Sequence, residues 1–215
     1  MPLFFSPSLW ESPKKFRHRF QAFGMGPDHA KALARKLNLL NPFGPIVVVG
    51  TAGALHPQLK VGDCFIVSQL YNSDSKTWIP ISSPYPIQFL PSAKAISQDG
   101  ILSRPNEKLK LFQNTEADIV DCESFYLWDE LNERLRSKLI IIRGVVDRQR
   151  DNIDFFNGFR LNFTKCSQPL SLFRMLRLGL NALKYQREMN PFFSRLMEIM
   201  DWDENTEAKA LKNGF

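Results

Sequence analysis

The run PIVVVG at residues 45–50 decides the fold class of this 215-residue chain. It contains four consecutive β-branched residues, from Ile46 to Val49, and no polar side chain. A strand without alternating polar positions is covered on both faces, as strands are in a parallel sheet between two layers of helices. The run therefore predicts an α/β protein.

Strand-like and helical patterns alternate on both sides of this run, which extends the prediction to the whole chain. Residues 71–91 hold four prolines, so irregular or edge structure is expected there. Pro191 should break the last helix, and a further helix should follow it. Strands are expected at 3–6, 16–23, 64–70, 94–97, 117–121 and 139–146, and helices at 28–40, 105–113, 123–136 and 169–189. The prediction is a three-layer α/β/α fold around a central mixed, mainly parallel twisted sheet.

Composition indicates a single domain at 1–215, with a helical C-terminal part of that domain at 165–215. Its 44% hydrophobic and 23% charged residues are ordinary for a globular domain. No apolar run approaches the roughly 18 residues that cross a bilayer, and the first residues do not follow the signal-peptide pattern. The three cysteines and three histidines are scattered, so we expect reduced thiols, a cytoplasmic location and no metal site.

The chain is basic, with a formal net charge of +6 and a pI near 9.3. The expected C-terminal helix carries several of the positive charges and places Leu172, Leu176, Leu180 and Leu183 along one side. Such a helix usually packs on its own domain or on a partner subunit, with its charges in solvent. Basic amphipathic helices also lie on membranes, so peripheral membrane contact stays open as an alternative. We expect no nucleic-acid partner.

Polar residues follow three of the predicted strands, where ligands of α/β proteins bind. They are the loop Gly50-Thr51-Ala52-Gly53, the pair Asp121 and Glu123, and Asp147. The loop offers backbone N–H groups and one hydroxyl, and Glu123 offers two acceptors that suit a diol. Asp147 becomes a proton donor if burial raises its pKa. Together these groups suit a ribose that carries a leaving base.

Each of these features also has a structural interpretation. The loop could be no more than a tight turn, and Asp121 or Glu123 could cap the helix that follows. Asp147 could pair with Arg148 or Arg150 in an exposed turn. The order and spacing of all three features favour a shared site over three unrelated ones.

Four motifs resemble those of a known family. They are GMGPDHA at 24–30, GTAGALHPQLKVGD at 50–63, PNEKLKLFQNTEADIVDCES at 105–124 and IIRGVVD at 141–147. Over residues 16–150 the chain resembles the nucleoside phosphorylase/nucleosidase superfamily. The likeness is strongest to its methylthioadenosine/S-adenosylhomocysteine nucleosidase branch, near the hopanoid-associated nucleosidases. The resemblance implies an N-glycosyl hydrolase that cleaves a purine nucleoside of the adenosine type without a cofactor.

The resemblance also implies roles for individual residues. Glu123 would bind the ribose hydroxyls and stabilise the oxocarbenium-like transition state, and Asp147 would protonate the departing base near its N7. Glu11 is the acid available near the N-terminus to activate water. The positions that the resemblance assigns to substrate binding or its support are Thr51, Ala52, Gly53, Gly100, Ile101, Asp121, Cys122 and Arg143. Members of the family are commonly dimers or larger, which implies a homo-oligomer.

Some positions depart from the family pattern and leave alternatives open. Val146 stands where a serine usually supports the final acid, and the bulky run 148–150 replaces small residues. A nucleoside-binding protein without turnover is therefore one alternative. Phosphorolysis is the other, although the Gly-Asp-Pro-x-Arg phosphate loop of the family's phosphorylases is not found in the sequence.

Overall fold

The computed structural model describes residues 2–82, 89–154 and 169–199, with the side chains of 169–176 and 199 outside the description. Its strands are β1 (Leu3–Ser6), β2 (Phe20–Ala22), β3 (Ile46–Ala54), β4 (Cys64–Asn72), β5 (Thr77–Pro80), β6 (Ser92–Ser97), β7 (Ile119–Asp121) and β8 (Leu139–Asp147). Its helices are the 3-10 helices η1 (Leu9–Glu11) and η2 (Lys14–Arg19), and the α-helices α1 (Pro27–Leu40), α2 (Pro105–Thr115), α3 (Ser124–Glu130), α4 (Glu133–Arg136) and α6 (Pro169–Ile199).

The strands form one mixed sheet that curls into a barrel. The order β2-β1-β3-β7-β6-β4-β5 is closed by β8, which is parallel to β3 and antiparallel to β4. The pairs β3–β7 and β4–β5 are also antiparallel. The expectation of a mainly parallel sheet was therefore wrong. The barrel closes because β8 pairs with β3 on one side and with β4 on the other, and β4 runs antiparallel to β8.

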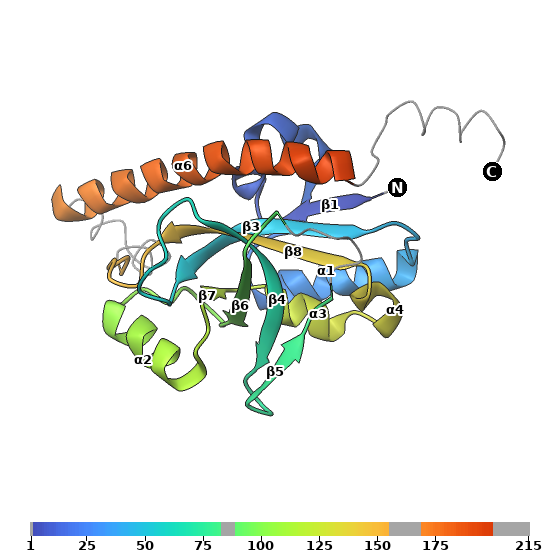
Figure 1. Ribbon diagram of the computed structural model, residues 1–215, viewed down its shortest axis with the longest axis horizontal. Coiled ribbons are helices and arrows are strands. Elements are labelled where there is room, and N and C mark those ends of the chain that lie inside the picture. The colour runs from blue at the N-terminus through green and yellow to red at the C-terminus, as the bar shows by residue number, and fades with distance from the viewer. Residues whose placement is uncertain (1, 83–88, 155–168, 200–215) are drawn as a thin grey trace.

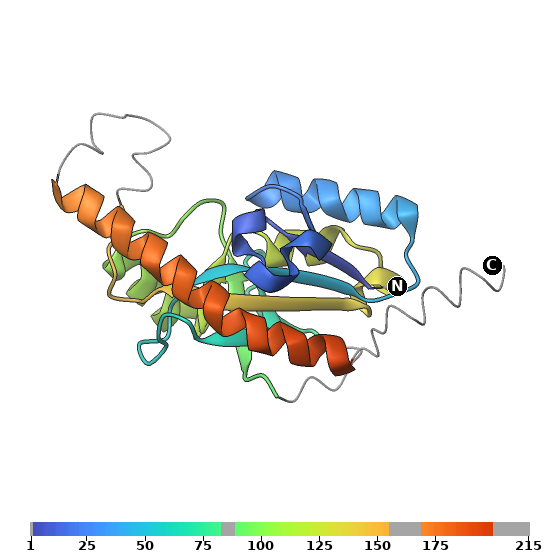
Figure 2. The same cartoon turned by 90° about the horizontal axis from the view of Figure 1, so that it is seen from above.

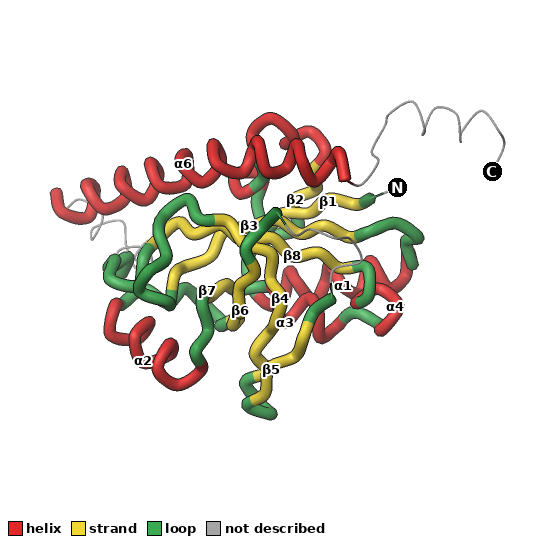
Figure 3. Tube along the Cα trace, in the orientation of Figure 1, coloured by secondary structure: helices red, strands yellow, loops and turns green. Residues whose placement is uncertain are grey.

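Helices cover both faces of this sheet, as the α/β prediction requires. α6 lies across one face beside η1 and η2, whereas α1, α3 and α4 lie on the opposite face (Figure 1, Figure 2). α2 lies near one end of the barrel, below β7 in the view of Figure 3. The sheet is thus the middle layer of the molecule.

β3 shows why the run at 45–50 is informative. Ile46 and Val48 pack in the core between the sheet and α1, while Val47 and Val49 pack in the core beneath α6. All four side chains are fully buried. A strand with two apolar faces must have a helix layer on each side, which is the arrangement observed.

Several element boundaries differ from the expectation. β3 continues through the predicted loop to Ala54, because residues 53–54 pair with β7. Residues 16–19 belong to η2 and leave a strand of three residues, β2. The helix expected at 123–136 is divided in two, because the side chain of Asn132 accepts from Leu135 N and starts α4. β5 confirms the expected edge structure within 71–91, and residues 83–88 lie outside the description.

α6 does not break at Pro191 but runs on to Ile199. A proline in a helix removes one N–H donor and usually kinks the helix. Here Pro191 lies on the exposed side, and Tyr185, Met189 and Phe193 are buried against the sheet on both sides of it along the helix. Packing of this face outweighs the lost hydrogen bond. The expected break was wrong for this reason.

Candidate active site

A cavity of about 400 Å³ opens at the carboxyl ends of β3, β7 and β8. This is a volume typical of small-molecule sites. The three features that the sequence placed after separate strands all reach it. The expected site residues that line the cavity are Glu11, Thr51, Ala52, Gly53, Gly100, Ile101, Asp121, Cys122, Glu123 and Asp147. Arg143 is the one expected residue outside the lining, and it is fully buried.

Glu123 presents a buried carboxyl group to the cavity. Its Oε1 accepts a hydrogen bond from Gly26 N at 2.9 Å, and Arg143 Nη2 lies 3.6 Å from its Oε2. Burial raises the pKa of Glu123 to about 7, against the opposing effect of the Arg143 charge. The side chain makes no capping hydrogen bond to α3. The structural interpretation of Glu123 as a helix cap is therefore not supported.

Asp121 does act as the cap of α3. Its Oδ1 accepts from Ser124 N at 3.2 Å and from the hydroxyl of Ser97 at 2.5 Å, and its Oδ2 accepts from Arg143 Nε at 2.6 Å. Burial alone would raise the pKa of Asp121, but Arg143 and the two serine hydroxyls overcome that effect and lower it. Both oxygens of Asp121 are therefore used in hydrogen bonds within the protein, and these bonds hold Arg143 and the start of α3 in place beside the cavity.

Arg143 lies beneath the site and connects its acids. Its Nη1 and Nη2 are buried and form no hydrogen bond within the described part of the chain. A Cβ atom at Gly50 would overlap the guanidinium and would also lie 3.3 Å from Glu11 Oε2. Gly50 is therefore required by the close approach of Arg143 and Glu11.

Glu11 reaches the cavity from η1. Its Oε2 accepts from Thr51 N at 2.7 Å and from Thr51 Oγ1 at 2.9 Å. Its backbone oxygen accepts from the hydroxyl of Tyr185 at 2.8 Å. The turn after β1 is thus tied both to Thr51 of β3 and to α6, which brings this distant acid into the site.

Asp147 pairs with a residue that the sequence reasoning missed, Lys108 of α2. It does not pair with Arg148 or Arg150. Burial raises the pKa of Asp147, and Lys108 opposes the rise. The one sequence signal was weak: Lys108 shares a helical stripe with Leu111 and Thr115, but a lysine at such a position is ordinarily expected to be exposed.

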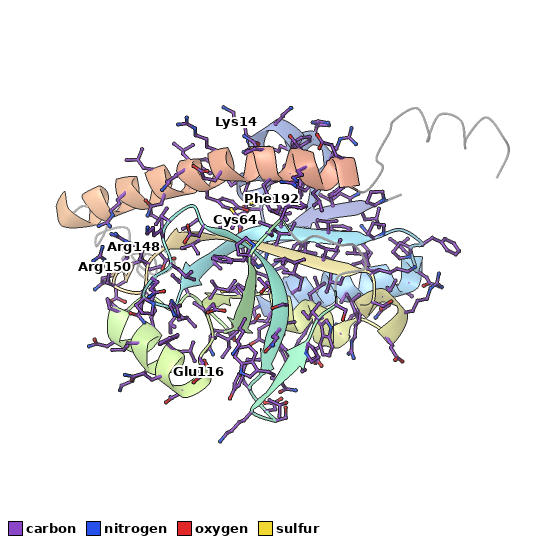
Figure 4. All side chains as sticks on the ribbon, viewed as in Figure 1. Lys14, Cys64, Glu116, Arg148, Arg150 and Phe192 are labelled. Atoms are coloured by element: carbon purple, nitrogen blue, oxygen red, sulfur yellow. The ribbon has the colours of Figure 1, made fainter. Side chains whose placement is uncertain are left out.

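The run 148–150 leaves the cavity open. Arg148 hydrogen-bonds Asp151 through its backbone N at 2.9 Å, and Gln149 Nε2 donates to Leu55 O at 2.5 Å. Arg148 and Arg150 lie at the outer edge of the molecule, near α2 and the N-terminal part of α6 (Figure 4). The lining of the cavity contains neither arginine.

α6 forms a wall of the cavity that was not expected from the sequence. Gly179, Ala182 and Tyr185 line it from this helix. The ring of Tyr185 packs directly on Gly144 of β8, where any Cβ atom would overlap it. Trp10 and Met25 line the opening and are exposed. The cavity is therefore largely apolar away from its acids.

In residues 2–82, 89–154 and 169–199, no group of three or more histidine, cysteine or acidic side chains could hold a metal ion. None of the helices in those ranges is long and apolar enough to cross a membrane. Cys64 and Cys122 are free thiols, and Cys166 lies outside the described ranges.

The sequence matches no protein-family model and no curated protein. Solved structures do match the fold. The 5'-methylthioadenosine/S-adenosylhomocysteine nucleosidase of Helicobacter pylori is 11% identical, covering 90% of this chain and 97% of that one, with a TM-score of 0.64. Futalosine hydrolase of the same organism is 12% identical over 90% of this chain and 97% of its own, with a TM-score of 0.63. The 5'-methylthioadenosine/S-adenosylhomocysteine nucleosidase of Streptococcus pneumoniae is 13% identical, covering 86% of this chain and 99% of that one, with a TM-score of 0.60.

At these identities the likeness shows the fold. The chain shares its fold with 5'-methylthioadenosine/S-adenosylhomocysteine nucleosidases and with a futalosine hydrolase. The neighbours are covered almost over their full length, so the similarity includes the whole of their domain.

Proposed function

We propose that this protein is a purine nucleosidase that hydrolyses the N-ribosidic bond of an adenosine-type nucleoside, such as methylthioadenosine or adenosylhomocysteine. One observation carries the proposal: Glu11, Glu123 and Asp147 come from three distant parts of the chain and line a single cavity. Each is held by different partners, so three carboxyl groups can have three functions. The fold of the neighbouring nucleosidases supports the same reaction class.

The reaction places opposite charges on the two halves of the substrate. As the bond breaks, the ribose becomes positive and the base gains electron density. The Glu123 carboxylate binds the ribose hydroxyls and stabilises the positive ring. Asp147 donates a proton to the base, while Glu11 accepts one from the water that attacks the anomeric carbon. Water thus supplies a hydroxyl to the sugar, and the base leaves protonated.

The lining of the cavity favours water over phosphate as the nucleophile. It contains no lysine or arginine among the described residues, and it includes the carboxyl group of Glu11. A phosphate dianion beside this carboxylate would be repelled without a compensating cation. The apolar wall from Leu178, Ala182 and Trp10 suits a hydrophobic 5' substituent such as a thioether.

Release of free purine from candidate nucleosides tests the proposal. The protein is incubated with methylthioadenosine, adenosylhomocysteine and futalosine, with and without phosphate, and bases and sugars are separated by chromatography. We expect free base and free sugar from at least one nucleoside, independent of phosphate. A sugar phosphate would instead indicate phosphorolysis, and binding without any release would indicate a protein that lost turnover.

Glu123→Gln should reduce purine release by a factor on the order of 10² to 10⁴, because the ribose loses its stabilising carboxylate. Glu116→Gln is the matched control, since Glu116 is exposed at the end of α2 and away from the cavity (Figure 4). Wild-type rates in Glu123→Gln would contradict the proposed role.

A further inference from the structure

α2 directs a fully buried lysine toward the candidate acid. Lys108 is 0% exposed, and its Nζ donates to Asp147 Oδ2, to Arg148 O at 3.1 Å and to Asp151 O at 3.2 Å. An ammonium group has three N–H donors, so these three acceptors satisfy it completely. Burial of a charge is tolerated when the charge is paired and hydrogen-bonded in this way.

The two oxygens of Asp147 are therefore not equivalent. Oδ2 is held by the ammonium group of Lys108, whereas Oδ1 forms no hydrogen bond to any described residue. The carboxyl group lies against Gly53, whose missing Cβ atom leaves room for both oxygens, and it lines the cavity. Only Oδ1 is available to a bound base.

An oxygen that accepts from an ammonium group is a poor place for a proton. When Asp147 is protonated, the proton is thus directed to Oδ1, the oxygen that Lys108 does not hold. When that proton moves to the base, the O–H bond at Oδ1 breaks and an N–H bond forms on the base. The negative charge left on Asp147 is then balanced by the adjacent ammonium group.

We propose that Lys108 is a positioning residue for the acid, a role that rests on the proposed nucleosidase function. It orients the carboxyl group of Asp147, directs its proton to Oδ1, and stabilises the carboxylate that forms as the proton leaves. α2 thereby provides the donor that β8 lacks, since Val146 has no polar side chain and packs in the core beneath α6.

Among the residues that the structure describes, few other charged groups face Asp147. Asp151 follows on the same segment and raises the pKa of Asp147, but its carboxylate is itself paired with Arg148 and Arg177, each at 3.2 Å. The β3 and β7 sides present Gly53 and Val120, which are uncharged. Among the described residues, Lys108 is thus the cation that opposes the rise in the pKa of Asp147 caused by burial.

The pH dependence of kcat/KM tests this role with Lys108→Met. An opposite charge at this distance typically lowers a carboxyl pKa by about 1–3 units. Removing the positive charge of Lys108 should raise the pKa of Asp147, so kcat/KM should begin to fall at a pH about one unit or more higher than in the wild type. At the acidic plateau the variant should be slower by a factor of about 10 to 10², because the acid is weaker and less well oriented. The two profiles should converge at alkaline pH.

The controls separate this role from a purely structural one. Lys110→Met, on the exposed face of the same helix, should leave both plateau and limb unchanged. Lys108→Gln keeps a hydrogen-bond donor without the charge, so it should also move the alkaline fall of kcat/KM to higher pH. It replaces Lys108→Met in the test if the methionine variant does not fold. An unchanged limb in a folded variant overturns the inference and leaves the nucleosidase proposal standing.

A measurement that needs no turnover distinguishes the two proposals. Asp147 can be titrated in the free protein by ¹³C NMR of labelled aspartate carboxyl groups, with Asp147→Asn used for assignment. We expect its titration to move to higher pH in Lys108→Met and Lys108→Gln. If no nucleoside is cleaved but the titration of Asp147 moves to higher pH in these variants, the proposed nucleosidase function is wrong and the effect of Lys108 on Asp147 still holds. If the titration does not move, the inference fails.

Discussion

At the scale of single residues, Glu123 shows how a site can oppose stability. Its carboxyl group is 4% exposed, and burial raises its pKa from 4.5 to about 7. Between these two values the folded state binds more protons than the unfolded state, so the free energy of unfolding falls as pH rises. Above pH 7 the full cost of the buried charge remains. At about 1.4 kcal/mol per pKa unit it amounts to roughly 3 kcal/mol.

Glu123→Gln should therefore become more stable, relative to wild type, as pH rises from 5 to 8. The gain should approach about 3 kcal/mol over this range, because glutamine cannot ionise. Urea unfolding of both proteins at pH 5, 6, 7 and 8 measures the change. A stability difference that is the same at all four values would show that the carboxyl group does not titrate in this window.

At the scale of elements, the site depends on how α6 lies on the sheet. The ring of Tyr185 occupies the space above Gly144, and its hydroxyl lies 2.8 Å from Glu11 O and 3.2 Å from Gly50 O. Further along the helix, Asn181 donates to Val146 O at 2.8 Å. α6 is thus bonded to the backbone next to Glu11 and next to Asp147, and its position sets theirs.

Gly144→Ala should displace α6, because the new Cβ atom would overlap the Tyr185 ring. Overpacking of this kind costs about 1–3 kcal/mol, and we expect purine release to fall along with stability. Gly179→Ala, in α6 itself, meets no atom of the described residues within 4 Å and should stabilise the helix by about 0.5–1 kcal/mol. Urea denaturation compares the two. Equal free energies of unfolding for the two variants would mean that α6 accommodates the new Cβ atom at Gly144 without loss of stability.

At the scale of the whole molecule, one exposed apolar surface adjoins α6. Trp10 is 64% exposed, and its backbone oxygen accepts from Gln186 of α6. Leu183, one helical turn before Gln186, is 53% exposed, and Leu180 is 66% exposed. Lys14 of η2 and Arg187 of α6 are exposed cations near this surface. The side chains of Leu172 and Leu176, which the membrane hypothesis also used, lie outside the described ranges.

This surface makes the membrane hypothesis testable. If it binds anionic lipid, vesicles with phosphatidylserine should carry the protein in flotation, and salt should weaken binding. Trp10→Ser with Leu183→Ser should abolish flotation. Leu40→Ser, on α1 across the sheet, should not. If the wild-type protein does not float with the vesicles, the membrane hypothesis is wrong. If the molar mass of the protein in solution is lower for the double variant than for the wild type, the surface is a contact between subunits.

Local pattern alone was enough to place the strands at 46–49 and 139–146, the helices at 28–40 and 105–113, and the acids at strand ends. These features depend on short-range spacing and on apolar runs that have few alternatives. The convergence of Glu123, Asp147 and residues 50–53, which the sequence placed in a loop and the structure places in β3, followed from the rule that ligands bind at strand ends.

The tertiary structure alone decided the rest. Barrel closure, the continuation of α6 through Pro191, and the pairing of Lys108 with Asp147 all join segments far apart in the chain. Their energies come from packing and from compensation of buried charge, which depend on what lies opposite each residue and not on its neighbours in sequence. A lysine reads as a solvent-exposed residue until the fold places a carboxylate in front of it.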